Sequence, residues 1–337
     1  MAAHASLARA RAQHRTGECV VMKRGAIASF LVGLGLAALP VLLAAAGQEF
    51  YLGLLTRVLI YALAATSLNL LLGYGGMVSF GHAAFLGIGG YVVAIAAQHG
   101  VGSAWVAWPL ALAIVALLGA VMGAISLRTR GVHFLMITLA LAQMFYYVFV
   151  SLRSYGGDDG LSMARRSSFG WEAWWPTGGD MGFYYLALVL LALALLVLHR
   201  LIPSRFGSVL IGVRENETRM STIGFPVYRY KLVAFVIAAV LCGLAGVLNV
   251  ELNRFISPSV MHWSQSGMLM VMVIIGGLGR PWAGVVGAAV FLGLEEVLSH
   301  YTERWQLPLG ILLLALVLAR VAGWNLPGSA RKEAQHV

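Results

Sequence analysis

The sequence predicts an all-α integral membrane protein with about ten transmembrane helices and one broken, glycine-rich segment. Of its 337 residues, 60% are hydrophobic and only 11% are charged, and its mean hydropathy is +0.84. A soluble domain carries about 25% charged residues, so this chain has too few polar side chains to cover a globular surface. The net charge of +10 comes from basic residues in short gaps between apolar runs, which indicates membrane topology rather than nucleic-acid binding.

A membrane-spanning helix needs about 20 apolar residues, and apolar runs of that kind recur along the chain. We expect spans at 26–46, 50–72, 82–98, 105–127, 132–150, 182–200, 231–251, 265–279, 282–298 and 306–322. The predicted organisation is a basic leader (1–25), a transmembrane domain (26–322) and a tail (323–337), with long polar loops at 151–181 and 200–230.

Basic residues orient these spans, because Lys and Arg favour cytoplasmic loops. If the N-terminus lies inside, most of the basic residues also lie inside. The exceptions are Arg57, which falls within a span, and a small outer group, Arg153, Arg165, Arg166, Arg254 and Arg304. We therefore expect a multi-pass protein of a bacterial inner membrane with both termini in the cytoplasm, the loop 151–181 outside and the loop 200–230 inside.

The sequence gives little support to enzyme chemistry. It contains no H-E-x-x-H, C-x-x-C or G-x-S-x-G motif, and we expect no metal or cofactor. Its two cysteines, Cys19 and Cys242, cannot form a disulfide framework. None of the lysines, Lys23, Lys231 and Lys332, follows a glycine, so the chain has no P-loop. If ATP drives this protein, another subunit must hydrolyse it.

Ion-coupled transport usually requires ionisable groups inside the bilayer. The candidates are Arg57, Glu251, Glu295 and Glu296, and each is expected close enough to a membrane surface to reach it. An ion-coupled secondary carrier is therefore disfavoured but stays an alternative.

The stretch "NLLLGYGGMVSFGHAAFLGIGGYVVAI" (69–95) carries more glycine than a lipid-facing helix needs. Close helix packing accounts for 87–90. For 73–82 we predict a broken helix that lines a substrate path, because polar side chains accompany the glycines there. The predicted path residues are Gly73, Gly75, Gly76, Ser79, His82 and Thr138. A second glycine-rich stretch, "VIIGGLGRPWAGVVGAAV" (273–290), predicts a tight helix–helix turn.

The inner loop predicts two short helices. Phe206, Val209, Leu210 and Val213 form one apolar face. After them, Asn216 is suited to cap a second helix that Gly224 ends. Such a segment can dock in a groove of a cytoplasmic partner or lie on the membrane surface, and we favour docking. The predicted docking residues are Arg214, Glu215, Asn216, Glu217, Arg219 and Gly224.

Five blocks in order resemble the permease subunits of branched-chain amino acid ABC importers, the LivM-type family. They are "LNLLLGYGGMVSFGHAAFLGIGGYVVAI" (68–95), "RGVHFLMITLALAQM" (130–144), "GGDDGL" (156–161), "SRFGSVLIGVRENETRMSTIGFPVYRYKLVAFVIAA" (204–239) and "SPSVMHWSQSGMLMVMVIIGGLGRPWAGVVGAA" (257–289). The resemblance covers nearly the whole chain after about residue 50.

The resemblance implies an ABC importer permease fold with ten helices and a passive membrane pathway for an amino acid. It also implies a second homologous permease subunit, two cytoplasmic ATPase subunits that meet 214–224 as a coupling segment, and a periplasmic substrate-binding protein. Membrane lipid is the remaining expected partner, and nucleic acid is not one. Urea and short-amide permeases share much of the pattern, so they remain an alternative, whereas a lipid or quinone enzyme is disfavoured by the missing catalytic clusters.

Overall fold

The computed structural model describes residues 40, 49–170, 179–301 and 306–321. Apart from residue 40, the predicted first span (26–46) lies outside the described residues, as do the leader, the tail, Cys19 and Arg304.

The described chain is almost entirely helical. Its helices are α2 (Glu49–Asn69), α3 (His82–Gln98), α4 (Ala104–Ser126), α5 (Val132–Ser151), α6 (Asp180–Leu201), α7 (Arg205–Glu215), α8 (Glu217–Thr222), α9 (Val227–Asn253), α10 (Trp263–Gly276), α11 (Ala283–Tyr301) and α12 (Gln306–Val321). A π-helical turn, η1 (Leu70–Tyr74), extends α2, and short 3-10 turns occur at Arg153–Tyr155, Gly157–Asp159 and Pro258–Met261. Strands β1 (Leu161–Ser162) and β2 (Phe255–Ile256) pair antiparallel, with Leu161 opposite Ile256.

The predicted membrane-protein fold is confirmed. Within the described ranges, 6 helices are long and apolar enough to cross a membrane: Tyr51–Tyr74, Ala104–Ser126, Val132–Ser151, Asp180–Leu201, Val227–Asn253 and Ala283–Tyr301. The helices α3 and α10 are apolar but shorter, and α12 has 16 residues. Each predicted span after the first thus corresponds to a helix, but the total of ten is not confirmed.

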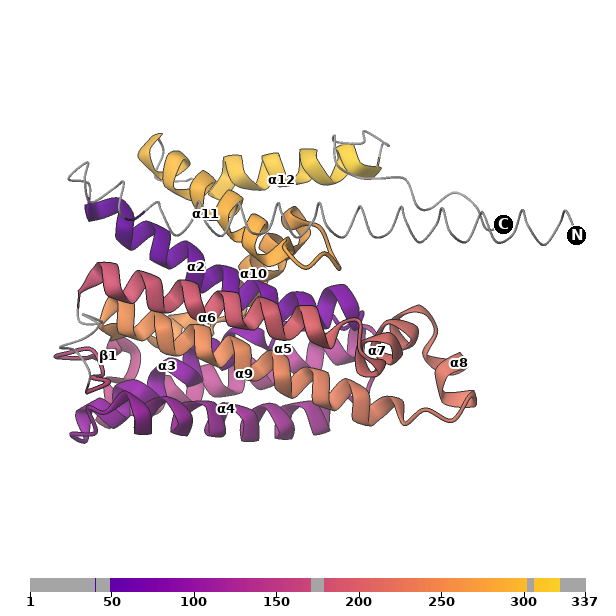
Figure 1. The fold of residues 1–337 in the computed structure, drawn as a ribbon, viewed down its shortest axis with the longest axis horizontal. Helices are drawn as coiled ribbons and strands as arrows, with labels where there is room; N and C mark the ends of the chain where they lie inside the picture. The colour runs from indigo at the N-terminus through magenta and orange to yellow at the C-terminus, as the bar shows by residue number, and fades with distance from the viewer. Residues whose placement is uncertain (1–39, 41–48, 171–178, 302–305, 322–337) are drawn as a thin grey trace, which may run out of the picture.

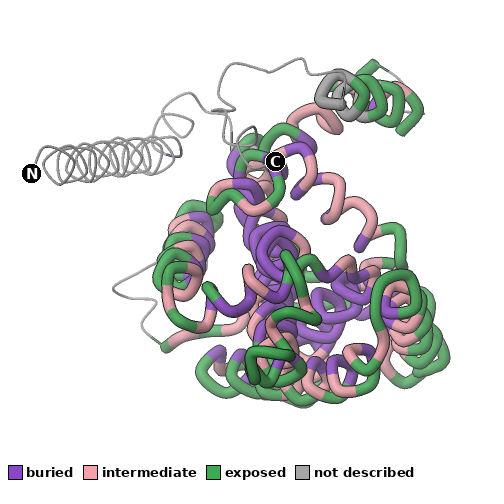
Figure 2. The backbone as a smooth tube through the Cα atoms, turned by 90° about the vertical axis from the view of Figure 1, so that its right-hand side faces the viewer, coloured by how far each residue is buried: buried purple, intermediate pink, exposed green. Residues whose placement is uncertain are grey.

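The long helices α4, α6 and α9 run nearly parallel, and α2 and α11 run obliquely to them (Figure 1). The short helices α7 and α8 lie at one end of the bundle, here named the α7–α8 end, and the two strands lie at the other, here named the sheet end. The helices α3 and α9 pack together in the centre, with α2 and α4 against them. Burial follows this arrangement, because buried residues concentrate in the middle of the bundle and exposed ones on its periphery (Figure 2).

Glycines allow the central helices to approach closely. A Cβ on Gly89 would overlap the carbonyl of Gly243 on α9, and one on Gly246 would overlap the carbonyl of Leu86 on α3. This geometry confirms that 87–90 serve packing. The turn predicted within 273–290 is also confirmed, since Gly276 packs on the backbone of Ala283 where α10 meets α11.

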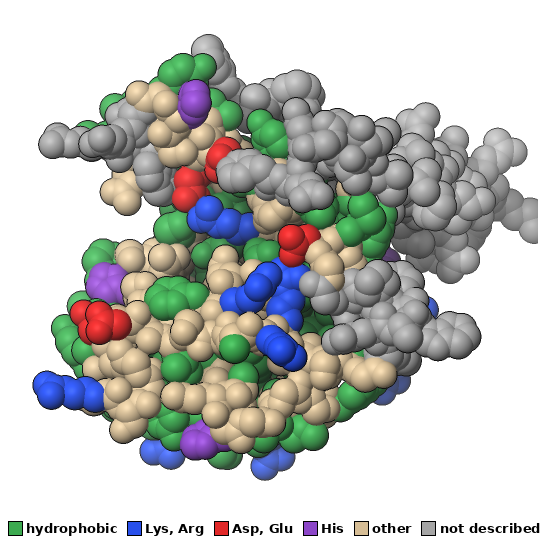
Figure 3. Space-filling model, turned by 90° about the vertical axis from the view of Figure 1, so that its left-hand side faces the viewer, with side chains coloured by type: hydrophobic (Ala, Val, Ile, Leu, Met, Phe, Trp, Pro, Cys, Tyr) green, Lys and Arg blue, Asp and Glu red, His purple; other side chains and the backbone are tan. Residues whose placement is uncertain are grey.

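Three of the ionisable candidates, Arg57, Glu251 and Glu295, have partners inside the protein near the sheet end. Arg57 Nη2 lies 3.2 Å from Glu295 Oε1 and joins α2 to α11, a contact that the sequence, which placed each side chain within reach of a membrane surface, did not predict. Glu251, only 2% exposed, accepts hydrogen bonds from the backbone N–H of Ser167 at 2.9 Å and from Trp108 Nε1 at 3.4 Å. Acidic and basic side chains gather on the hollowed face of this end (Figure 3).

Candidate substrate path and coupling site

The glycine-rich segment breaks the helix, as predicted. The π-helical turn at the end of α2 is closed by a hydrogen bond from Gly75 N to Leu70 O of 3.1 Å, and Met77 N then bonds to Leu71 O at 2.9 Å. Residues 75–81 are not helical, and α3 begins at His82. Gly76 has a φ of 65°, a left-handed conformation that costs a residue with a Cβ about 1–2 kcal/mol.

Side-chain hydroxyl groups of other helices accept hydrogen bonds from backbone N–H groups at the break and at the start of α3. Phe80 N donates to Thr138 Oγ1 on α5 at 3.3 Å, and Ala83 N donates to Ser266 Oγ on α10 at 2.9 Å. The first N–H groups of a helix lack partners within the helix, and leaving them unpaired in a membrane costs several kcal/mol each. Sequence reasoning selected Thr138 but missed Ser266, because nothing in the local pattern of α10 signals a contact with α3.

His82 lies at the start of α3 in a fully buried cluster of polar side chains. Its Nε2 lies 2.8 Å from Ser67 Oγ, and Ser67 Oγ in turn donates to Ala64 O at 2.6 Å. Because a serine hydroxyl has one proton, this arrangement assigns the imidazole proton to Nε2. The remaining nitrogen, Nδ1, is buried and has no hydrogen-bond partner within the described part of the chain.

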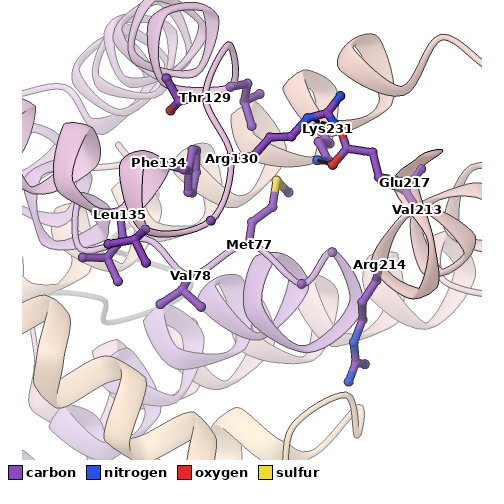
Figure 4. A pocket seen from close by; sticks show the side chains of 15 residues that line it. Met77, Val78, Thr129, Arg130, Phe134, Leu135, Val213, Arg214, Glu217 and Lys231 are labelled. Atoms are coloured by element: carbon purple, nitrogen blue, oxygen red, sulfur yellow. Dashed lines mark hydrogen bonds and ion pairs between the residues drawn. The ribbon is translucent and has the colours of Figure 1, made fainter. Parts of the chain in front are cut away.

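A cavity of about 410 Å³ lies at the α7–α8 end (Figure 4). Four segments form its wall: the break, the turn between α4 and α5 with the start of α5, the junction of α7 and α8, and the start of α9. Its lining residues are Gly75, Gly76, Met77, Val78, Leu127, Thr129, Arg130, Gly131, Val132, Phe134, Leu135, Val213, Arg214, Glu217 and Lys231.

The structure divides the predicted path residues into three groups. Gly75 and Gly76 line the cavity. Gly73 packs on the backbone of Gly279 instead. The polar members, Ser79, His82 and Thr138, are 2%, 0% and 0% exposed and lie deeper in the bundle. Their role in a substrate path therefore stays a prediction.

One side of the cavity is charged and the rest is largely apolar. Glu217 Oε2 lies 2.7 Å from Lys231 Nζ, and Glu217 Oε1 lies 3.3 Å from Arg130 Nε. Figure 4 shows these three side chains gathered together, while Met77 and Phe134 stand on another part of the wall. The carboxylate of Glu217 therefore links α8 both to the α4–α5 turn and to α9.

The helix α7 has the predicted apolar face. Val209, Leu210 and Val213 are buried, and Phe206 stacks on Tyr230 with ring centroids 5.6 Å apart. Burial of this face holds α7 against the bundle, so α7 is part of the folded core rather than a free surface helix.

Both predicted ends of α8 are confirmed. Asn216 Oδ1 accepts a hydrogen bond from Arg219 N at 2.9 Å and caps the helix. At the other end Gly224 has a φ of 98°. Gly224 N bonds to Ser221 O at 3.0 Å, and Phe225 N bonds to Met220 O at 3.2 Å, which together form a Schellman motif.

The predicted docking residues do not all face the same way. Glu215 and Arg219 are exposed, and so is Ile223, at 63%, beside them. Arg214 is also exposed, but its Nη1 donates to the carbonyl of Gly73 in η1, and its side chain extends away from the cluster of Arg130, Glu217 and Lys231 (Figure 4). Arg214 thus connects the α7–α8 junction to the glycine-rich break.

A family model described as "branched-chain amino acid transport system / permease component" matches residues 50–319, which include the break, the cavity and α7–α8. The chain belongs to this family. This permease is 27% identical to the high-affinity branched-chain amino acid transport system permease protein LivM of Salmonella typhimurium over 290 residues, covering 80% of this chain and 68% of that one.

The LivM protein of Escherichia coli gives the same identity and coverage. A probable branched-chain amino acid transport permease protein LivM of Methanocaldococcus jannaschii is 24% identical over 298 residues, covering 75% of this chain and 82% of that protein. No solved structure matches the chain. The protein is thus a multi-pass membrane permease of an ABC transport system, which works with ATPase and binding-protein partners.

Proposed function

We propose that this permease carries branched-chain or closely related amino acids across a bacterial inner membrane. In this proposal it works with a second homologous permease, two cytoplasmic ATPase subunits and a periplasmic substrate-binding protein. The observation that carries the proposal is the match of residues 50–319 to the branched-chain amino acid permease family, and the coupling mechanism is supported by the direct connection between the break and the α7–α8 junction, through the Arg214–Gly73 hydrogen bond and the shared cavity. A transporter needs such a connection if ATP hydrolysis outside the membrane is to move helices inside it.

The distribution of basic residues supports placing the α7–α8 end and both termini in the cytoplasm. The basic residues at or beside the α7–α8 end are Arg128, Arg130, Arg200, Arg205, Arg214, Arg219, Arg229, Lys231 and Arg280. The loops of the sheet end hold a smaller described set, Arg153, Arg165, Arg166 and Arg254. Since cytoplasmic loops carry the excess of Lys and Arg, the sheet end faces the periplasm and the binding protein.

The helix α8 and its Schellman turn form the proposed contact with the ATPase. Ile223, Phe225 and Tyr228 are exposed and close together in the chain after α8, so this end offers apolar side chains next to the charged ones of α8. An amphipathic helix of this kind suits a groove on a partner. A displacement of the α7–α8 junction would pull on the break through Arg214 on α7 and on α9 through Glu217 on α8, which pairs with Lys231.

The path itself is proposed to run along 73–82. Ser79, His82 and Thr138 supply polar groups there that a zwitterion can contact, and His82 Nδ1 has no hydrogen-bond partner among the described residues. Since these side chains are closed off in the present structure, they would be uncovered in another state of the cycle. No charged side chain is needed, because selection of the substrate can be left to the binding protein.

Uptake by the reconstituted transporter tests the proposal. Proteoliposomes that contain both permeases and the ATPase are supplied with the binding protein, ATP and labelled leucine, isoleucine, valine, urea or acetamide. We expect ATP-dependent uptake of the branched-chain amino acids. Uptake of urea or acetamide alone would replace the amino-acid proposal, and uptake driven by an ion gradient without ATP would replace the ABC mechanism.

A matched pair of charge reversals tests the coupling contact. Arg219→Glu changes an exposed residue of α8, and Arg200→Glu changes an exposed residue at the same end of the bundle, on α6. We expect Arg219→Glu to reduce uptake per ATP hydrolysed and Arg200→Glu to leave that ratio unchanged. Equal ratios in the two variants would remove α8 from the coupling contact.

A further inference from the structure

We propose that the cavity at the α7–α8 end is a cytoplasm-facing binding site for the amino acid itself, and that an occupant slows the transport cycle. This inference rests on the proposed function, because it takes the transported amino acid as the ligand and places this end in the cytoplasm. It adds a second site for the substrate, which is loaded from the side of release rather than from the periplasm.

The cavity offers both kinds of surface that a branched-chain amino acid needs. Met77, Val78, Phe134 and Leu135 provide apolar contacts for an aliphatic side chain, and Arg130, Glu217 and Lys231 provide charges of both signs for the α-carboxylate and α-ammonium groups. Its volume of about 410 Å³ falls within the range of about 300–1,000 Å³ that is usual for small-molecule sites.

The charged cluster is arranged to accept a zwitterion. Two cations share the single carboxylate of Glu217, so the cluster has one uncompensated positive charge that can bind a carboxylate. The side chain of Lys231 is 13% exposed and held at 2.7 Å from Glu217. That of Arg130 is 72% exposed, so it is free to turn towards an incoming carboxylate, which would release Glu217 Oε1 to accept from the ammonium group.

An occupant of this cavity would contact the parts that the cycle has to move. It would touch the break at Met77 and Val78, α8 at Glu217 and α9 at Lys231. A ligand that binds one conformation stabilises it in proportion to its affinity for that conformation over the others. Amino acid accumulated in the cytosol would therefore hold α8 in its present position and lower the rate of ATP hydrolysis.

The test uses the assembled transporter in lipid nanodiscs, where both faces are accessible, without binding protein. ATPase activity is titrated with leucine, with isocaproate, which lacks the ammonium group, and with isoamylamine, which lacks the carboxylate. We expect leucine to lower the rate of ATP hydrolysis. Each analogue should need about a tenfold higher concentration for the same inhibition, because each lacks one charge-assisted interaction with the cluster. Equal potency of the three compounds, or no effect of leucine, would overturn the proposal.

Substitutions in the cavity test whether leucine inhibits hydrolysis from this site. Arg130→Gln removes the mobile cation, and Leu135→Trp fills the apolar part of the cavity. The control is Arg128→Gln, which removes a charge of the same turn that is not among the described lining residues. With inhibition scaled to each variant's own uninhibited rate, the first two should raise the half-inhibiting concentration of leucine about tenfold or more, and the control should not. An equal shift in all three variants would place the inhibitory site elsewhere.

The outcomes separate this inference from the proposed function. If wild-type proteoliposomes take up leucine but leucine does not inhibit hydrolysis, only the cavity proposal fails. If they take up no branched-chain amino acid, the proposed function fails. If both cavity variants fail to assemble, the analogue series in the wild-type protein decides.

Discussion

Gly76→Ala is predicted to destabilise the permease and to impair uptake, because two costs combine at this position. The residue has a φ of 65°, which costs a residue with a Cβ about 1–2 kcal/mol. The added Cβ would also lie 2.8 Å from Cγ of Arg214, and overpacking of this kind costs about 1–3 kcal/mol. The sum is about 2–5 kcal/mol, and even its lower limit shifts a conformational equilibrium about thirtyfold.

Two other glycines separate the two costs. Gly224 has a φ of 98° but open space around its Cβ position, so Gly224→Ala should show backbone strain alone. Gly53 lies within α2, and a Cβ there would meet nothing within 4 Å. Gly53→Ala should therefore be neutral or gain up to about 1 kcal/mol of helix propensity.

The assay is thermal unfolding of the purified transporter together with uptake in proteoliposomes. The expected order of unfolding temperatures is Gly53→Ala at or above the wild type, then Gly224→Ala, then Gly76→Ala. Because the displaced Arg214 would weaken its bond to Gly73, Gly76→Ala should also reduce uptake by at least about tenfold in the complexes that still assemble. If Gly76→Ala unfolds and transports like Gly53→Ala, the break does not depend on this glycine and the reasoning is wrong.

Three further predictions test topology, capping and the outer loop. In a protein with Cys242 and Cys19 replaced, an impermeant thiol reagent added to intact cells should label Asp159→Cys but label Thr218→Cys only after lysis, and the opposite result would invert the orientation. Asn216→Ala should remove the cap of α8 at a cost of about 1 kcal/mol and lower uptake per ATP, and an unchanged ratio would show that the cap is not needed for coupling. Glu251→Gln should destabilise the sheet end by about 1–3 kcal/mol, measured by faster proteolysis of the loop 151–181, and unaltered proteolysis would show that this carboxylate does not anchor the loop.

Sequence reasoning reached the features that are encoded locally. Apolar runs located the helices, and the caps at Asn216 and Gly224 located α8, because both signals come from residues close together in the chain. The break was predicted because glycines and polar side chains occur together within 73–82. These features depend on backbone conformation and short-range hydrogen bonds, which sequence patterns report directly.

The features that sequence reasoning missed are contacts between distant segments. Arg57 and Glu295 are 238 residues apart, and Arg214 and Gly73 are 141 residues apart. No pattern in the neighbouring sequence indicates either contact. From its position in the chain alone, Arg57 was expected to reach the membrane surface and Arg214 to meet the ATPase. The cavity likewise combines four segments, so no single stretch of sequence indicates that it exists.

The π-helical turn Leu70–Tyr74 has a consequence for how this helix tolerates changes of length. A π turn holds one residue more than an α turn over a similar rise, so it accommodates a one-residue insertion. Deleting one residue here would regularise the helix and leave the side chains before the turn on their present faces. The same deletion at Ile60, which is fully buried, would rotate one half of α2 by about 100° relative to the other. Length variation in this helix should therefore be tolerated at its last turn and not within its core.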